Sequence, residues 1–161
     1  MTGAPAFRFA LLTISDTRTA ADDLSGAAMR DLVEGRGHTV FDAAIVRDEP
    51  AQVRERVLAW AADPGCDAIV ASGGTGLSGR DRTVEAVCDL FEPRIEGFGE
   101  LFRMLSFSEI GSRAMLSRAA AGVVRGTPVF LLPGSPKAVD LGMSRLVLPE
   151  IGHVLGELRR S

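Results

Sequence analysis

The first half of the sequence alternates short apolar runs with segments of helical periodicity. Residues 7–14 form a nearly continuous apolar run, as expected for a parallel strand that is covered on both faces. Strand patterns return at 39–46 and 67–72, and helical patterns lie between them, over 22–34 and from Pro50 onwards. This order of strand, helix, strand, helix, strand predicts a layered α/β sheet with right-handed crossovers.

The apolar spacing also predicts which face of each helix is buried. In the segment 22–34, Leu24, Ala28 and Leu32 lie four residues apart and suit one face of an amphipathic helix that Gly35 and Gly37 end. The helix that starts at Pro50 has a second such face, which consists of Val53, Val57, Trp60 and Ala61.

The second half of the sequence adds a hairpin and more helices. We expect a short helix over 82–90, and then a helical stripe of Phe98, Leu101, Phe102 and Leu105. Val123-Val124 and 129–132 flank Arg125-Gly126 and predict an antiparallel hairpin. From Pro136 the pattern is helical, with a break expected at Pro149. The predicted fold is a three-layer α/β/α sandwich with a mostly parallel sheet that carries an antiparallel hairpin, and 161 residues suit one domain.

Composition excludes several classes of protein. The formal net charge is −3 and the basic residues are spread along the chain, which disfavours nucleic-acid and membrane-surface binding. We expect a cytoplasmic protein, because the first ten residues lack a signal-peptide pattern and no apolar run approaches 18 residues. The spacing of Cys66, Cys88, His38 and His153 favours neither a zinc site nor a disulfide framework.

The sharpest local feature is Ser72-Gly73-Gly74-Thr75-Gly76, which directly follows a predicted buried strand. Glycines let backbone N–H groups approach an anion closely, and a following helix start adds positive dipole. The alternative is a tight strand-to-helix turn with no ligand. Gly74, Gly76 and Gly79 also match the dinucleotide fingerprint, but only weakly, because they follow the third strand instead of the first. The motif therefore predicts a phosphate-binding turn.

A second turn, Pro133-Gly134-Ser135-Pro136-Lys137, also follows an apolar strand and opens a helix. Pro136 suits the first helical position, Ser135 can cap the helix or donate to phosphate, and Lys137 supplies a positive charge. An ordinary serine-capped helix start is the alternative. Together with the first turn, this one predicts a crevice that holds a phosphate-bearing small molecule.

Two carboxylates lie between a predicted strand and the helix that follows it. Asp48 and Asp81 are either helix N-caps or ligands that hold a hydrated Mg²⁺ against phosphates. Ser15 and Asp16 follow the first strand and Ser25-Gly26 open the next helix, so all four would lie along the same edge of the sheet. We predict that they complete the crevice.

Taken together, the first turn with Arg80-Asp81 and the segment 132–138 resemble the pterin-binding domain of molybdenum cofactor biosynthesis proteins, the MoaB/Mog family. Gly97-Phe98-Gly99-Glu100 and 103–107 are similar to its B branch in particular. The resemblance implies a three-layer α/β fold, a homotrimer or homohexamer, and molybdopterin as substrate, adenylylated on its phosphate by ATP with magnesium. It also implies that Asp48 and Asp81 are the catalytic carboxylates and that the two glycine turns contact pterin and phosphate, with Arg80 beside them.

Our functional hypothesis is therefore Mg²⁺-dependent adenylylation of molybdopterin, with Lys137 offsetting charge on the pyrophosphate that leaves. Two alternatives stay open. One is an oligomer that carries molybdopterin without catalysis. The other is a nucleotide pyrophosphatase, because a related domain occurs in proteins of the competence/damage-inducible type.

Overall fold

A computed structural model describes residues 3–160 of the chain, so residues 1–2 and 161 of the predicted domain lie outside it. At its centre is a five-stranded sheet in the order β2-β1-β3-β5-β4. The strands pair in parallel except for β4, which runs antiparallel to β5. Their bounds are β1 (Arg8–Ile14), β2 (Thr39–Val46), β3 (Ala68–Ser72), β4 (Ala120–Val124) and β5 (Thr127–Leu132).

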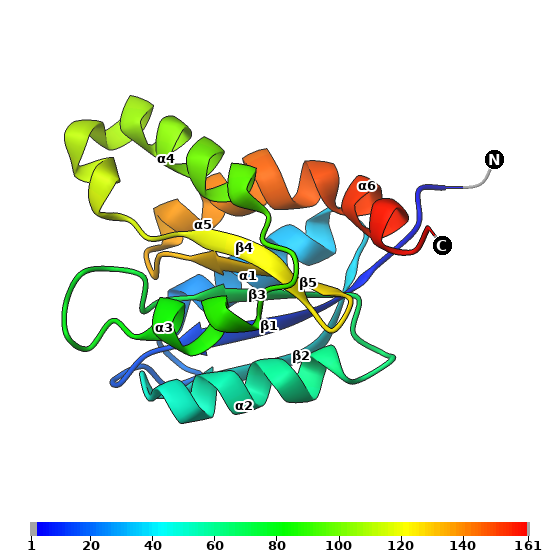
Figure 1. Cartoon of the computed structure of the whole chain (residues 1–161), viewed down its shortest axis with the longest axis horizontal. Helices are drawn as coiled ribbons and strands as arrows, with labels where there is room; N and C mark the ends of the chain where they lie inside the picture. The colour runs from blue at the N-terminus through cyan, green and yellow to red at the C-terminus, as the bar shows by residue number, and fades with distance from the viewer. Residues whose placement is uncertain (1–2, 161) are drawn as a thin grey trace.

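Helices cover both faces of the sheet (Figure 1). One face packs on α1, α4, α5 and α6 and the other on α2 and α3, each around its own apolar core. The helices are α1 (Leu24–Gly35), α2 (Pro50–Ala61), α3 (Thr83–Val87), α4 (Glu96–Ile110), α5 (Pro136–Gly142) and α6 (Leu148–Leu158), with the short 3₁₀ segments η1 (Cys88–Leu90) and η2 (Gly111–Leu116) and the π-helical turn η3 (Met143–Val147). This arrangement confirms the predicted three-layer sandwich. No helix among residues 3–160 is both long enough and apolar enough to cross a membrane.

The predicted hairpin and the buried face of α2 are confirmed. Strands β4 and β5 meet at Arg125 and Gly126, whose φ angles of 49° and 84° suit a type I′ turn that matches the twist of the sheet. In α2, the four predicted core residues Val53, Val57, Trp60 and Ala61 are buried.

The predicted faces of two other helices were partly wrong. In α1 the buried row is Ser25, Met29 and Val33, whereas Leu24 is 68% exposed. A spacing of four residues places side chains on one side of a helix, but it does not say which of two adjacent rows is buried. The buried Ser25 side chain satisfies its hydroxyl there by a hydrogen bond to the Gly134 carbonyl. In α4, Leu101 of the predicted stripe is exposed.

The break expected at Pro149 is a widened turn instead. Pro149 lies in the first turn of α6, and the π-helical turn η3 precedes it directly. Proline lacks an N–H group and its ring crowds the preceding turn, which a π-helical turn relieves. The helical direction thus continues from α5 into α6.

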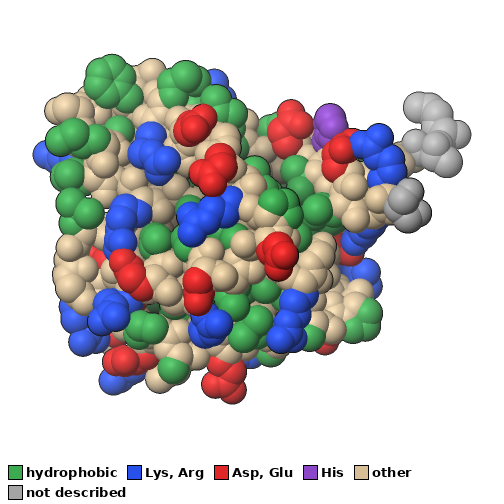
Figure 2. Space-filling model, viewed as in Figure 1, with side chains coloured by type: hydrophobic (Ala, Val, Ile, Leu, Met, Phe, Trp, Pro, Cys, Tyr) green, Lys and Arg blue, Asp and Glu red, His purple; other side chains and the backbone are tan. Residues whose placement is uncertain are grey.

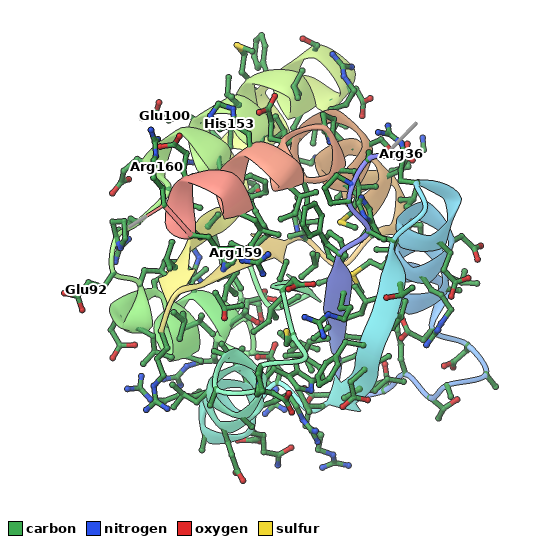
Figure 3. The ribbon with its side chains drawn as sticks, turned by 90° about the vertical axis from the view of Figure 1, so that its right-hand side faces the viewer. Arg36, Glu92, Glu100, His153, Arg159 and Arg160 are labelled. Atoms are coloured by element: carbon green, nitrogen blue, oxygen red, sulfur yellow. The ribbon has the colours of Figure 1, made fainter. Side chains whose placement is uncertain are left out.

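An ion cluster ties the two ends of the described chain to the start of β3. The nearly buried Asp67 carboxylate accepts hydrogen bonds from the Arg8 backbone N–H at 2.7 Å, from Arg8 Nε at 3.1 Å and from Arg159 Nη2 at 2.6 Å. Arg159 follows α6 and lies between that helix and the sheet (Figure 3). Burial by itself would raise the pKa of Asp67, but the hydrogen bonds from Arg8 and Arg159 outweigh it and lower that pKa.

Candidate functional site

The predicted site segments gather at one edge of the sheet. Because β1, β2, β3 and β5 are parallel, their carboxyl ends meet at the same edge. The segments that leave these ends are Ser15-Asp16 after β1, Asp48 after β2, Gly73 to Gly76 after β3 and Pro133 to Lys137 after β5. Strands β3 and β5 are neighbours, so the two glycine turns lie beside each other.

The first turn depends on its glycines for a steric reason. Gly73 and Gly74 have φ angles of 107° and 70°, which side-chain-bearing residues rarely adopt. The Gly73 N–H donates to the Leu132 carbonyl at 2.9 Å, and the Thr83 hydroxyl donates to the Gly73 carbonyl at 2.9 Å. Thr83 is buried and presses so closely on Gly74 that a Cβ there would overlap its hydroxyl. Sequence reasoning missed Thr83 as a support of the turn.

The short helix expected over 82–90 is confirmed as α3 and η1, and a loop separates it from the turn. The intervening loop folds on itself, with the Ser78 N–H donating to Asp81 Oδ2 at 3.1 Å and the Asp81 N–H donating to the Ser78 carbonyl at 2.9 Å. The Thr83 N–H at the start of α3 donates to the Gly74 carbonyl at 3.1 Å. The N-terminal dipole of α3 is thus directed at the turn's own backbone.

Arg118 holds the first turn from outside. Its backbone N–H donates to the Thr75 carbonyl at 3.0 Å, its Nε to the Gly76 carbonyl at 3.0 Å and its Nη2 to the Asp81 carbonyl at 2.9 Å. Its remaining donors pair with Glu85, and that ion pair lowers the pKa of Glu85. One side chain therefore fixes both ends of the loop that carries Asp81. Nothing in the local sequence around Arg118 predicts this role.

The second turn rests against the first. A Cβ on Gly134 would stand 3.3 Å from Gly73 Cα, so the two backbones come close. The Ser25 hydroxyl donates to the Gly134 carbonyl at 2.5 Å, and Arg18 Nη1 donates to the same carbonyl at 3.3 Å. Ser25 is fully buried, so it supports the turn from behind. Arg18 is a second support that sequence reasoning missed.

Two further predicted residues of this turn differ in their surroundings. Ser135 caps α5 and its Oγ accepts from the Ala138 N–H at 3.2 Å, which leaves its hydroxyl hydrogen free to donate elsewhere. Pro136 begins α5 as predicted, and Lys137 is exposed beside it. Gly26 does not line the pocket between the turns, and its N–H donates to Asp23 Oδ1 at 2.9 Å.

Three aspartates lie near one another beside the first turn. Asp16 Oδ2 pairs with Arg80 Nη2 at 2.5 Å and Asp16 Oδ1 accepts from the Asp48 N–H at 3.1 Å. The Arg80 hydrogen bond lowers the pKa of Asp16. Burial raises the pKa of Asp48, and the carboxylates of Asp81 and Asp16 add to this effect. Repulsion of this kind is what a bound cation relieves.

A pocket of about 490 Å³ opens between the two turns. Its walls include Gly73, Gly74, Thr75 and Gly76 of the first turn, Pro133 and Gly134 of the second, and Asp81. Segment η2 and the loop after it supply Arg113, Leu116 and Ser117, and the loop after the first turn supplies Leu77. Sequence reasoning missed these four residues. Ser15, Asp16, Asp48, Arg80, Ser135 and Lys137 surround the turns without lining this pocket, and Ser72 is buried beneath them with an Oγ that has no hydrogen-bond partner among the described residues.

Fold and site together define a class of α/β protein in which two glycine turns meet at the carboxyl edge of the sheet around a pocket of small-molecule size. Residues 10–153 match the family model described as a probable molybdopterin binding domain, and the chain belongs to this family.

Known relatives agree with this assignment. The chain is 49% identical over 152 residues to the molybdenum cofactor biosynthesis protein B of Halalkalibacterium halodurans, with 94% of this chain and 89% of that protein covered. It is similar to a crystal structure of a molybdenum cofactor biosynthesis protein B, with 45% identity, a TM-score of 0.96, and 99% of this chain and 100% of that chain covered. It is also similar to the tungsten cofactor synthesizing protein MoaB of Pyrococcus furiosus, with 35% identity, a TM-score of 0.87, and coverage of 98% and 100%. The predicted resemblance is confirmed.

Proposed function

We propose that this chain acts in molybdenum cofactor biosynthesis, where it binds molybdopterin between the two glycine turns and transfers AMP to its phosphate from ATP. The observation that carries the proposal is the contact between the two turns, with a pocket between them and Asp81 on its wall. The family of the chain and the names of its relatives favour the pterin as ligand.

The donor set beside the pocket suits a magnesium ion. Among the described residues no group of three or more His, Cys, Asp or Glu side chains is placed to hold a metal. Mg²⁺, however, is often bound through one or two carboxylates with substrate phosphates as further ligands. Asp48 and Asp81 are the pair that would hold it, because both follow strands at this edge of the sheet and Asp81 lines the pocket. Burial is the main cause of the raised pKa of Asp48, and the nearby Asp81 and Asp16 carboxylates add to it. When bound, the ion would neutralise charge on the phosphates.

The residues of the chain act by binding and positioning. A phosphate oxygen of molybdopterin forms a bond to the α-phosphorus of ATP while the bond from that phosphorus to the bridging oxygen breaks, and pyrophosphate leaves. A phosphate monoester with a second pKa of about 6 is already an anion near neutral pH, so the step requires no strong base. Lys137, the only lysine in the sequence, is the cation we assign to the leaving pyrophosphate.

Release of pyrophosphate from ATP tests the proposal directly. We expect purified protein with Mg²⁺ to release it only when molybdopterin is added. Asp81→Asn should abolish this release and leave pterin affinity largely intact, whereas Asp31→Asn, which removes an exposed carboxylate from α1, should change neither. Pterin binding without release in the unmodified protein would identify a non-catalytic carrier. Hydrolysis of ADP-ribose without pterin would identify a pyrophosphatase.

Ser135 allows a second test that separates ligand binding from helix capping. Ser135→Ala removes both the cap and the hydroxyl donor, whereas Ser135→Asp keeps a good cap and adds a negative charge. We expect both variants to weaken molybdopterin binding, Ser135→Asp more strongly, and ATP binding to change less. If Ser135→Asp bound the pterin normally while Ser135→Ala did not, the serine would act through its cap alone.

We also propose that the chain assembles as a homotrimer or homohexamer through α4 and η2. The outer face of this segment exposes Leu101, Met104, Phe107, Ile110, Met115 and Leu116, with Phe107 at 62% and Met115 at 78%. Figure 2 shows hydrophobic side chains gathered over α4. Apolar patches of this kind mark protein interfaces. Phe107→Glu should shift sedimentation velocity to a smaller species, and Leu24→Glu, at an isolated exposed leucine on α1, should not.

A further inference from the structure

A second cavity, of about 400 Å³, lies between α4 and the α3–η1 segment along strand β4. The side chains of Arg94, Arg103 and Arg118 line it, over a floor that includes Ile95 and Ala121. It adjoins the pocket between the glycine turns, and Ser117 lies at the boundary of both. The function proposed above does not use this cavity.

The backbone fixes Arg94 at the rim. Arg94 forms an isolated antiparallel bridge with Gly122, and the neighbouring Ile95 N–H donates to the Ala121 carbonyl at 2.9 Å. Gly122 is required here, because a Cβ would overlap the ring of Phe91 that packs on it. Among residues 3–160, the one hydrogen bond of the Arg94 guanidinium runs from Nη2 to the Cys88 carbonyl at 3.4 Å. Most of its donors are therefore available to a ligand.

Arg103 is held still more firmly. Its Nη1 donates to the Ala119 carbonyl at 2.9 Å and to the Ser117 carbonyl at 3.4 Å. A Cβ at Gly99 would stand 2.7 Å from Arg103 Nη2, so the glycine makes room for the guanidinium against the backbone of α4. The Nε and Nη2 groups of Arg103 make no hydrogen bond to any of the described residues, and the two Nη1 contacts hold them in place. Such a guanidinium is ordered before any ligand arrives, which reduces the entropy lost on binding.

The charge on the cavity walls is not balanced. Asp and Glu outnumber Lys and Arg in the sequence by 21 to 18, yet neither Arg94 nor Arg103 forms an ion pair among the described residues. Arg118 is paired with Glu85, and Glu96 is the carboxylate that lines the cavity. Figure 2 shows basic and acidic side chains next to one another on this face between α4 and α3. Two guanidiniums thus face one carboxylate.

We propose that this cavity is a second anion site, which binds a compact polyanion of the phosphate class through Arg94 and Arg103. Guanidinium groups bind phosphate oxygens in a bidentate manner, and Arg103 is already held in place by its two backbone contacts. The site is distinct from the pocket between the glycine turns, which is walled mainly by the backbone of the two turns and, among the described residues, has Arg113 as its one lining arginine. It does not depend on the adenylylation proposed above.

The test is a titration of the ¹⁵N-labelled full-length protein with inorganic pyrophosphate, without Mg²⁺, followed by NMR. We expect the chemical shifts of the amides of residues 119–121 and of the Arg103 Nε group to change with pyrophosphate concentration and to saturate together, with one dissociation constant. Amides of Gly73, Gly76 and Gly134 report separately on the glycine turns. Binding at the turns alone, with no saturable shift at 119–121, would overturn the second site.

Two variants should change the affinity for pyrophosphate, as measured by this titration, in opposite directions. Arg94→Gln removes an exposed donor and should weaken binding at 119–121 about three- to tenfold, with the curve at the glycine turns unchanged. Glu96→Gln removes the carboxylate on the cavity wall and should strengthen binding by a similar factor. The control is Arg36→Gln, at an exposed arginine beyond α1 that Figure 3 labels, and it should leave the curve in place.

These outcomes decide between specific and diffuse attraction. If Arg94→Gln and Arg36→Gln weakened binding equally, the shifts would reflect general charge and the site would be rejected. If Glu96→Gln left the affinity unchanged or lowered it, the proposed electrostatic balance would be wrong. Melting temperatures of all three variants check that each is folded, and should Arg94→Gln fail to fold, Glu96→Gln still decides.

Discussion

Substitution of Gly74 by alanine tests how the first glycine turn is held. The residue has a φ of 70°, where a side chain costs about 1–2 kcal/mol. The new Cβ would stand 2.0 Å from Thr83 Oγ1, so the Thr83 hydroxyl must leave its place and lose its hydrogen bond to the Gly73 carbonyl. An unpaired buried polar group costs about 1–3 kcal/mol. We therefore expect Gly74→Ala to lower the free energy of unfolding by about 2–5 kcal/mol.

Equilibrium unfolding in urea measures this change. Gly79→Ala is the matched control, because a Cβ there meets nothing within 4 Å and the residue has no positive φ; it should be neutral to within about 0.5 kcal/mol. A double-mutant cycle with Thr83→Ala isolates the overlap, since the double variant removes the hydroxyl and should cost less than the sum of the two single changes. If Gly74→Ala matched Gly79→Ala, or if the two single costs added, the overlap would not govern the turn.

Three further predictions concern the supports and the thiols. Asp67→Asn should lower the free energy of unfolding by about 2 kcal/mol and the melting temperature by about 4–8 °C at pH 7. Because the folded-state pKa of Asp67 is lowered, its contribution is present above pH about 4 and is lost below, so calorimetry at pH 3 should show a smaller gap between variant and parent. Arg118→Gln should speed hydrogen exchange over 75–82, whereas Arg113→Gln, which only lines the pocket, should not, and equal exchange in both would contradict the clamp. Burial raises the pKa of Cys66 to about 11 and also raises that of Cys88, so both thiols should react with a disulfide reagent at pH 8 only after urea is added, and prompt reaction of the folded protein would count against their burial.

The layers of the fold were predictable from the sequence because their signals are local. Apolar runs and proline or glycine boundaries placed β1, β2, β3 and the hairpin within a residue or a few of where the structure has them. Periodicity was a weaker guide to which row of α1 faces inward. Leu24 and Ser25 are adjacent, and the choice between their rows depended in part on the Gly134 carbonyl, which lies far away in the sequence. Met29 and Val33, which are fully buried, share the inner row with Ser25, so apolar burial and this hydrogen bond both favour that row over the row of Leu24.

The sequence predicted the glycine turns and the polar residues after the strands, but it did not predict most of the residues that hold the turns in place. Glycine pairs after strands carry a conformational signal that a reader of the sequence can recognise, and the structure shows the positive φ angles at Gly73 and Gly74. Arg18, Thr83 and Arg118 act through contacts that the fold alone creates, and their residue types are common on any protein surface. The contribution of η2 to the pocket could not be predicted for the same reason. Its residues follow α4 and are far from both turns in the sequence, and only the fold brings them to the pocket.

These long-range supports explain why the same glycine motif can either be a plain turn or serve a ligand. Backbone N–H groups attract an anion strongly only if they are already held in place, since an anion that must order a flexible loop loses that entropy from its affinity. Here Thr83 and Arg118 hold the first turn and Ser25 and Arg18 hold the second, all from outside the motifs. The two supported turns then touch through Gly73 and Gly134. A motif search finds the glycines, whereas the arginines and hydroxyls that hold the two turns in place can be found only from the fold.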